Sequence, residues 1–522
     1  MLLVLWKLEV CTTRGCTRTA ALLINSISKT TDPCDDFYEH ACGRWIREHP
    51  IPPDLDHYDR YIELDDALKH QYMTLDVGTM WNNWLHIQEE IQKCFANPTT
   101  VTIQAEGLKR WERHFDFAAY FAAIGVQIGP NTTISVAQEA FDKFAQLLDD
   151  GAKSEFAGEA LVYMIFLENQ HGMRRRYVTE DTIRECHQFV TEEAMPLWTV
   201  SFYRRHILQN PDFDNEKAIV ENMRAAFKET LNEDDWLEPA TKEKILSMLE
   251  KLDLYLGAFY EAYSEEKLMA HYNKRLPMDA TNFFDWKSRF YQDVAGKELL
   301  SDSRYKLQLD VDAYSRKLYA WIPLGYLGFH SDDYALEYQY AQLGFTIGHE
   351  MTHTFDTNIE WKGNGTVFAG NDRAEFDEKT HCIVEQFKNI THADESGETV
   401  TEAGETSIPE TMSDNMAVRT SFRAFRKELN RRYGREGDAF RLPGLEQYTT
   451  DQLFFLSLAN TFCGSYTPAG LAEAAQQIHP PHKSRISTAM KNSAEFANAF
   501  KCKKNAPMNP EKKCRVWRYK KH

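Results

Sequence analysis

Helical periodicity dominates the hydrophobic pattern of this chain. The segment NEKAIVENMRAAFKETLNEDDWLEPATKEKILSMLEKLDLYLG, residues 215–257, twice repeats apolar residues at the spacing of one helix face. It therefore predicts two consecutive amphipathic helices. The apolar stripe of the first is formed by Ile219, Met223, Phe227 and Leu231, and that of the second by Ile245, Met248, Leu249 and Leu252.

Strand patterns are scarce, and the clearest lies in the stretch LDVDAYSRKLYAWIPL, residues 309–324. Two runs rich in β-branched and aromatic residues flank Ser315, Arg316 and Lys317. This pattern predicts a β-hairpin with its turn at those three residues.

The stretch IGHEMTHTFD, residues 347–356, contains a His-Glu-x-x-His motif. On a helix, His349 and His353 lie one turn apart on the same face, so both imidazoles can reach one metal ion. Imidazole nitrogen is a common zinc ligand, and Glu350 would stand beside a water on that ion as its base. The alternative is a solvated or salt-bridged helix face with two ordinary histidines.

The residues around the motif favour the metal site. Apolar side chains at Phe345, Ile347, Met351 and Phe355 predict that this helix is largely buried. Two histidines and a glutamate on a buried helix need strong polar partners, and a metal ion would supply them.

A third ligand is expected from the stretch SIPETMSDNMAVRTSF, residues 407–422. Glu410 and Asp414 are four residues apart and share one helix face, which suits a ligand carboxylate with a second carboxylate orienting a ligand imidazole. Asp356 is a candidate for another such orienting group. The alternative is a capping box, in which Ser407 and Glu410 only satisfy the start of a helix.

Composition and charge exclude several classes of protein. A chain of 522 residues predicts two or more lobes, and 43% hydrophobic residues is typical of a packed globular protein rather than a disordered one. The formal net charge of −18 argues against a nucleic-acid partner. No run approaches 18 consecutive apolar residues, so no bilayer-spanning helix is expected in this sequence.

The chain has ten cysteines and no C-x-x-C spacing. An even, widely spread set is compatible with five disulfides formed in an oxidising compartment. The alternative is a set of reduced thiols in a cytosolic enzyme. Three glycosylation acceptor patterns, at Asn131, Asn364 and Asn389, agree with the oxidising compartment.

Several ordered motifs resemble those of the neprilysin and endothelin-converting-enzyme family of zinc metallopeptidases. Near the start, residues 32–46 read DPCDDFYEHACGRWI, and the centre contains VDAY, IGHEMTHTFD and ETMSDN. Near the end come FCGSYTP, HPPHKSRI, NSAEFANAF and MNPEKKCRVW. The resemblance therefore covers both ends of the chain. The chain looks like a shortened member of this family.

The resemblance implies one Zn²⁺ per chain, bound by His349, His353 and Glu410. Glu350 would be the general base that activates a zinc-bound water. Asp414, together with Asp356, would orient the ligands.

The resemblance also implies residues that bind the substrate. His479 would stabilise the oxyanion, and Arg485 would hold the substrate backbone. Residues 312–314 would pair with the substrate as a strand, although Asp312 stands beside Ala313 where the family has Asn. Phe345 and Phe462 match a primed-side pocket, which implies cleavage before apolar or aromatic residues.

The fold implied is mainly α (α+β) with two lobes. Residues 1–90 and 290–522 would build a thermolysin-like catalytic lobe with a small β-hairpin sheet, and residues 91–289 a shortened helical lobe roofing it. The family's disulfide pattern would join Cys11 to Cys16, Cys34 to Cys502, Cys42 to Cys463, Cys94 to Cys186, and Cys382 to Cys514.

The expected function is that of an extracellular zinc endopeptidase acting on small peptides. It would be secreted, or the ectodomain of a single-pass type II membrane protein whose anchor lies upstream. Thr354, Met416 and Ala417 replace glycines of the family, as Asp312 replaces its Asn. These departures support the alternative of a catalytically silent homologue that binds peptides or proteins.

Overall fold

The computed structural model divides the chain into two compact units. The first contains Met1–Leu68, Thr191–Leu268 and Ser303–His522, and the second contains Lys69–Val190 and Met269–Asp302. The structure describes residues 9–53, 55–75, 101–114, 117, 129–136, 138–149, 200, 201, 204, 213–257, 311–316, 318–329, 334–355, 367, 368, 370–393, 399–434 and 440–517.

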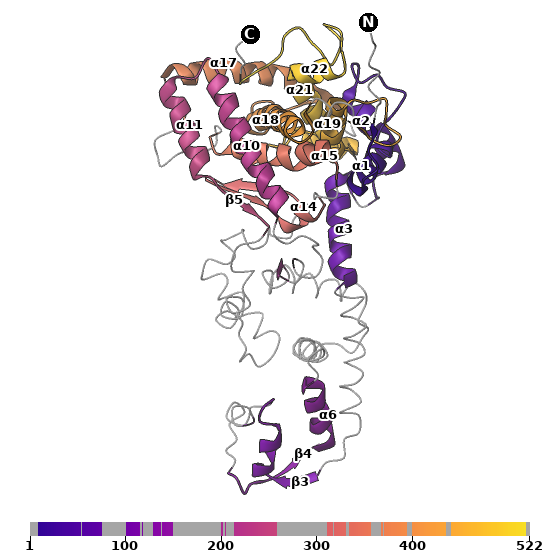
Figure 1. Ribbon diagram of the computed structural model, residues 1–522, viewed down its shortest axis with the longest axis vertical. Helices are drawn as coiled ribbons and strands as arrows, with labels where there is room; N and C mark the ends of the chain where they lie inside the picture. The colour runs from indigo at the N-terminus through magenta and orange to yellow at the C-terminus, as the bar shows by residue number, and fades with distance from the viewer. Residues whose placement is uncertain are drawn as a thin grey trace. The chain divides into compact units, whose positions relative to one another are not determined.

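The first unit is mainly helical, as the sequence predicted (Figure 1). Its helices include α1 (Arg14–Ile24), α2 (Phe37–Glu48), α10 (Asp214–Glu233), α11 (Pro239–Lys251), α14 (Leu324–Phe329), α15 (Leu336–Gln339), α16 (Phe345–His353), α17 (Gly370–Phe387), α18 (Ile408–Tyr433), α19 (Thr450–Thr461), α20 (Pro468–Ala474), α21 (His482–Asn492) and α22 (Ala494–Ala499). Helix α3 (Arg60–Leu75) begins in this unit.

Helix α18 is the central element of the first unit, and Figure 1 shows it surrounded by other helices. Pro409 stands in its first turn, where proline's missing N–H costs nothing, and Gly434 ends it with a φ of 57°. Helices α10, α16 and α17 pack against it. Because α18 is buried along much of its length, it determines where its neighbours lie.

Helix α16 carries the His-Glu-x-x-His motif and approaches α18 closely. It continues from α15 through η6 (Tyr340–Gly344), a π-helical turn. A Cβ added at Gly348 would lie only 3.2 Å from the Cα of Ala417 and 2.9 Å from Oγ1 of Thr420. A glycine is therefore needed at this position to bring the two backbones together.

The predicted apolar residues of the motif helix are all buried, as are both predicted stripes of α10 and α11. The helices themselves are confirmed at Asp214–Glu233 and Pro239–Lys251. Their position differs from the predicted division, which placed residues 91–289 in a separate lobe. Because α10 packs on α16 and α18, Thr191–Leu268 belongs to the first unit.

The predicted hairpin is confirmed as β6 (Tyr314–Arg316) and β7 (Tyr319–Ile322), which pair antiparallel. Strand β5 (Asp253–Leu256) pairs parallel to β7, so the three strands have the order β5-β7-β6. The remaining strands of this unit form two-stranded sheets: β1 (Glu9–Val10) with β10 (Phe440–Arg441), β2 (His57–Asp59) with β11 (Gly464–Tyr466), and β8 (Thr391–Ala393) with β9 (Thr399–Thr401).

The described part of the second unit includes an antiparallel strand pair and two helical segments. Strands β3 (Val101–Gln104) and β4 (Thr133–Val136) pair antiparallel beside η2 (Ala105–Trp111) and α6 (Gln138–Asp149). Trp111 is buried, and its indole N–H donates to Oδ1 of Asp142 at 2.9 Å. This contact joins η2 to α6.

Among the described residues four disulfides are present, and each matches a predicted pair. Two of them, Cys34–Cys502 and Cys42–Cys463, join the N-terminal segment to the C-terminal part of the chain. The reduced-thiol alternative is therefore wrong for these eight cysteines. The fifth predicted pair, Cys94 with Cys186, lies outside the described residues.

Two of the three glycosylation acceptors, Asn131 and Asn389, are exposed, whereas Asn364 lies outside the described residues. Over the part of the chain that the structure describes, no helix has the length and apolar character needed to cross a membrane.

The nested bridges predict unequal losses of stability. Removing Cys34–Cys502 with two serines should lower the free energy of unfolding by about 4 kcal/mol. While Cys42–Cys463 stays intact, the loop that Cys34–Cys502 closes runs over residues 34–42 and 463–502, about 47 residues, and its length sets the expected loss. Removing Cys11–Cys16, whose cysteines are five residues apart, should cost about 2 kcal/mol. Urea unfolding followed by circular dichroism measures both variants. Equal losses would show that loop length does not determine the contribution of these bridges.

Candidate metal centre

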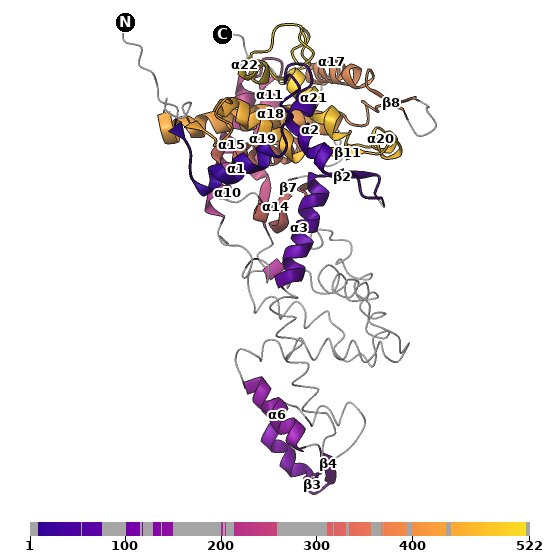
Figure 2. The same cartoon turned by 90° about the vertical axis from the view of Figure 1, so that its right-hand side faces the viewer.

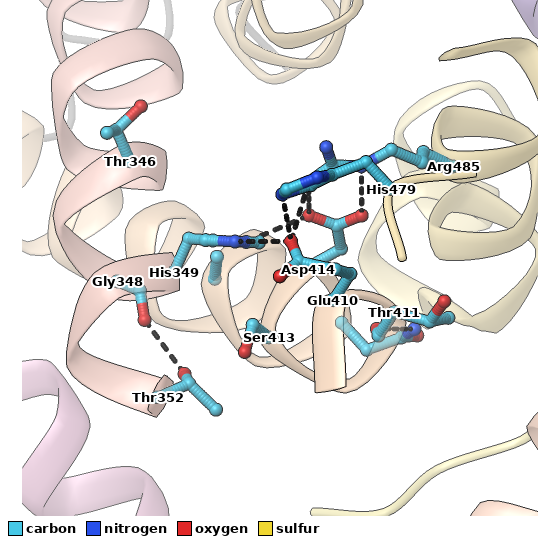
Figure 3. Close-up of polar contacts among 12 residues, drawn as sticks. Thr346, Gly348, His349, Thr352, Glu410, Thr411, Ser413, Asp414, His479 and Arg485 are labelled. Atoms are coloured by element: carbon cyan, nitrogen blue, oxygen red, sulfur yellow. Dashed lines mark hydrogen bonds and ion pairs between the residues drawn. The ribbon is translucent and has the colours of Figure 1, made fainter. Parts of the chain in front are cut away.

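Helices α16 and α18 bring the predicted triad of His349, His353 and Glu410 together. Figure 3 shows His349 and Glu410 directed toward each other. Nε2 of His349 lies 3.0 Å from Nε2 of His353 and 3.1 Å from Oε2 of Glu410. Nε2 of His353 lies 3.4 Å from Oε1 of Glu410. Three potential ligand atoms therefore surround one point, although they come from segments about 60 residues apart.

These separations fit a tetrahedral zinc ion. With zinc–ligand bonds of about 2.0–2.1 Å, the ligand atoms of a tetrahedral site lie about 3.3 Å apart. The three observed separations lie close to that value. Two imidazoles and one carboxylate are also a donor set that catalytic zinc sites use.

A second carboxylate supports the triad from behind. Oδ1 of Asp414 lies 3.0 Å from Nδ1 of His349, on the side of the ring away from the other two ligands. Asp414 in turn accepts two hydrogen bonds from Arg485, from Nε at 2.8 Å and from Nη2 at 2.7 Å. This chain of contacts directs Nε2 of His349 toward the centre.

The surrounding carboxylates favour positive charge at this point. Burial alone would lower the pKa of His349, but its hydrogen bonds with Asp414 and Glu410 outweigh burial and raise that pKa to about 10. Burial would raise the pKa of Glu410, yet its contacts with His349 and His479 hold it well below the usual range. A site with this electrostatic preference suits a cation.

Glu350 follows the first histidine and is buried. Its surroundings include Tyr326, whose hydroxyl lies 2.7 Å from Oγ1 of Thr346 on the same helix as the motif. Burial raises the pKa of Tyr326 far above its usual range, and the nearby Asp312 and Glu350 contribute to that rise. Tyr326 therefore remains a neutral hydroxyl beside the predicted base.

His479 and Arg485 both reach the centre from the C-terminal part of the chain (Figure 3). Nε2 of His479 lies 3.1 Å from Oε2 of Glu410, and its side chain is 60% exposed. Nη2 of Arg485 lies 3.8 Å from the same oxygen. His479 thus faces both solvent and the triad, whereas Arg485 is buried against Asp414.

Aromatic side chains extend from the triad on one side. The ring of Phe345 lies 6.1 Å from that of His349 and meets Phe462 edge-to-face at 5.8 Å. The guanidinium of Arg485 lies over Phe462 at 5.2 Å, and Tyr61 contacts the same ring at 6.1 Å. The predicted pair Phe345 and Phe462 is therefore in contact beside the histidines.

The predicted substrate strand lies beside α16. Asp312 is exposed, and its Oδ1 accepts the N–H of Ala313 at 2.9 Å. Strand β6 begins two residues later, at the edge of the β5-β7-β6 order, and packs near α16. Its position among the described strands is compatible with pairing to an extended peptide.

The structure decides between ligand and cap for Glu410. Ser407 precedes α18 but makes no capping hydrogen bond, because its hydroxyl donates to carbonyls at Ala403 and Gly404 instead. The capping-box alternative is therefore wrong, and Glu410 faces the histidines. The predicted orienting residue Asp356 lies outside the described residues.

Two of the three departures from the family's glycines are accommodated locally. Thr354 is fully buried, and its hydroxyl donates to the carbonyl of Met351 at 2.7 Å. Ala417 packs against Gly348, which supplies the space that the two helices need. Thr354 and Ala417 therefore fit at these contacts without the glycines of the family.

Sequence reasoning missed three residues near the centre: Tyr61, Tyr326 and Ser413. Oγ of Ser413 lies 3.5 Å from Nδ1 of His353. Burial raises the pKa of Tyr61 well above its usual range, with Asp312 and Tyr326 adding to the rise. Ser413 could have been found from its position between Glu410 and Asp414, but no spacing signal connects the two tyrosines to the motif.

Comparison with known sequences identifies similar proteins. Two profiles of peptidase family M13 match residues 315–516 and 33–76. Neprilysin-1 of Caenorhabditis elegans is 28% identical over 321 residues, covering 57% of this chain and 41% of that protein. Human neprilysin is 29% identical with the same coverage, so the chain spans about two fifths of the length of these relatives. Human membrane metallo-endopeptidase-like 1 is 21% identical over 98% of this chain and 89% of that protein.

Two solved structures show the same fold at low identity. Mycobacterium tuberculosis zinc metalloprotease Zmp1, in complex with an inhibitor, superposes with a TM-score of 0.61 at 16% identity, covering 95% of this chain and 99% of that one. A Haemonchus galactose-containing glycoprotein complex gives a TM-score of 0.63 at 16% identity, covering 98% and 100%.

The triad predicts about one zinc ion per chain. Glu410→Gln replaces an anionic ligand by a neutral amide and should lower zinc affinity at least about tenfold. Glu405→Gln is the matched control, because Glu405 is an exposed glutamate five residues away. Zinc content measured by inductively coupled plasma mass spectrometry, with a competing chelator, tests both variants. A wild-type protein that takes up no stoichiometric zinc would contradict the metal site.

Proposed function

Because this chain belongs to peptidase family M13, the neprilysin family of zinc metallopeptidases, we propose that it is a zinc-dependent endopeptidase that hydrolyses small peptides. The observation that carries the proposal is the meeting of His349, His353 and Glu410 at distances that fit zinc, with Glu350 beside them. Peptide hydrolysis needs an activated water, a stabilised oxyanion and a held substrate. The chain offers residues for each of these tasks.

Zinc bound at the triad would act as a Lewis acid that lowers the pKa of water and polarises the scissile carbonyl. Glu350 is the proposed base that takes a proton from the attacking water. Its neighbour His349 is held by Asp414, and Glu350 is buried on the same helix, α16. The same glutamate can then deliver the proton to the leaving amine.

His479 is the proposed donor to the oxyanion that forms when water attacks. Its Nε2 lies 3.1 Å from Oε2 of Glu410, so the ring already points toward the centre, and its exposed side chain is accessible to substrate. An N–H donor directed at developing negative charge stabilises the transition state more than the ground state.

Asp312 and Ala313 are proposed to pair with the substrate backbone, and Arg485 to hold a substrate carbonyl. Support comes from the location of β6 at a sheet edge and from the burial of Arg485 beside the triad. The aromatic rings of Phe345 and Phe462 favour cleavage before an apolar or aromatic residue.

The four disulfides and the exposed acceptors at Asn131 and Asn389 support a location outside the cell. The alternative of a silent homologue is less well supported. It was supported by the departures at Asp312, Thr354, Met416 and Ala417, and of these Thr354 and Ala417 fit their surroundings.

Glu350→Gln should abolish peptide cleavage, lowering kcat at least about 10²-fold to 10⁴-fold, while zinc content stays at one per chain. The change removes the base but leaves both imidazoles and Glu410 in place. Cleavage of a mixed peptide library, followed by mass spectrometry, measures the activity. If the variant retains full activity when free of wild-type protein, another group takes the proton.

Asp312→Asn should raise kcat/KM toward small peptides by about tenfold to a hundredfold. An ionised aspartate only accepts hydrogen bonds, whereas asparagine also donates one to a substrate carbonyl. Asparagine can keep the existing bond to the N–H of Ala313 through its own oxygen. Steady-state cleavage of a fluorogenic peptide measures the ratio. An unchanged or lower kcat/KM would show that this strand does not bind the substrate backbone.

A further inference from the structure

On the connection between β9 and α18, a buried carboxylate has no role in the proposed reaction. Glu402 follows strand β9, and its side chain is only 1% exposed. Nε2 of His392, on strand β8, lies 2.7 Å from its Oε1. The hydroxyl of Ser484, on helix α21, donates to the same oxygen. We name these three residues the Glu402 cluster.

The Glu402 cluster is not a second hydrolytic triad. A serine nucleophile needs a histidine as its direct base, with the carboxylate behind that histidine. Here the order is reversed, because Ser484 and His392 both bind the carboxylate and the carboxylate lies between them. The cluster also offers only two metal-ligating side chains, and within the described ranges it forms no candidate metal group.

Strands β8 and β9 form a hairpin, and Glu402 directly follows it. Further hydrogen bonds join this hairpin and the residues after it to the start of the segment 475–484, which carries His479. The N–H of Ala403 donates to the carbonyl of Ala475 at 2.9 Å. The side-chain amide of Gln476 donates to the carbonyl of Thr401 at 2.8 Å. Figure 2 shows α20, which ends just before this segment, next to β8.

The hairpin therefore holds residues 475–484 at both ends. Ala475 and Gln476 are bound at the start of the segment, and Ser484 is bound at its end, next to Arg485. Between these points residues 476–479 are exposed, with Ile478 39% exposed and the side chain of His479 60% exposed, whereas Pro480 and Pro481 are buried. Apart from its own contact with Glu410, His479 is therefore positioned by how firmly the two ends of this exposed stretch are held.

We propose that Glu402 is a positioning residue that fixes residues 475–484, so that His479 and Arg485 meet the metal centre in the correct geometry. Glu402 acts through Ser484 and the hairpin and does not touch substrate. The consequence for catalysis rests on the proposed function, whereas the consequence for the segment's order does not. Small displacements of a catalytic donor reduce rates strongly, so the anchoring should be measurable in kcat.

Three variants and one control test the proposal on the zinc-loaded protein. Glu402→Ala leaves Ser484 and His392 without their shared acceptor, whereas Glu402→Gln keeps an amide oxygen that can accept from both. Ser484→Ala removes only the link to α21. Glu405→Ala is the matched control, because Glu405 is an exposed glutamate on the same connection.

Each protein is compared by hydrogen–deuterium exchange of residues 475–485, by zinc content, and by kcat and KM on a fluorogenic peptide. We expect Glu402→Ala to increase exchange in this segment at least about tenfold and to lower kcat about tenfold to a hundredfold, with little change in KM. Ser484→Ala should have a smaller effect of the same kind. Glu402→Gln should keep both the exchange of residues 475–485 and kcat close to the wild-type values, and the control Glu405→Ala should match wild type.

Two results would overturn the proposal. Unchanged exchange in residues 475–485 of both Glu402→Ala and Ser484→Ala would show that the cluster does not hold the segment. Zinc loss, or faster exchange throughout the first unit, in both variants would show general structural support instead. If the wild-type protein cleaves no peptide, the proposed function fails, and the exchange measurement alone still decides whether Glu402 orders the segment.

Discussion

The close approach of α16 and α18 is the constraint on which the rest of this structure depends. The two backbones come together at Gly348, where even a methyl group would meet Ala417 and Thr420. Only at this separation can the imidazoles of one helix reach the carboxylates of the other. The hydrophobic faces of both helices supply the driving force for this contact.

That contact buries charged groups that must neutralise one another. Glu410 and Asp414 lie one turn apart on α18, and two buried carboxylates so close together need positive partners. Arg485 donates two hydrogen bonds to Asp414. Burial alone would raise the pKa of Asp414, but its contacts with Arg485 and His349 outweigh burial and lower that pKa to about 2. Glu410 then faces His349 and His353, where a zinc ion would complete the neutralisation. The electrostatics that make the site costly to bury are those that favour a cation.

Residues from both chain ends complete the surroundings of this contact. Tyr61, near the N-terminus, contacts Phe462, and the bridge between Cys42 and Cys463 joins the same two regions. Tyr38 strengthens this connection, since its hydroxyl donates to the carbonyl of Phe462. The hairpin that holds residues 475–484 adds a third support from the middle of the chain.

Short-range patterns in the sequence were sufficient for the helices, the hairpin and the two histidines of the motif. Their periodicities of 3.6 and two residues arise from local backbone geometry, so the stripe through Met223 and the face shared by His349 and His353 could be predicted directly. Local pattern alone could not choose between ligand and cap for Glu410; resemblance to a family favoured the ligand. The same resemblance, not spacing, supplied the four disulfide pairs.

Only the tertiary structure decided which distant residues meet. It placed α10 and α11 in the first unit, brought Tyr61 and Tyr326 toward the metal centre, and joined Glu402 to Ser484. None of these contacts has a periodic signal, because each joins segments whose separation along the chain is arbitrary. A local pattern records which face of a helix is apolar, whereas the partner of that face is set by the packing of the whole unit.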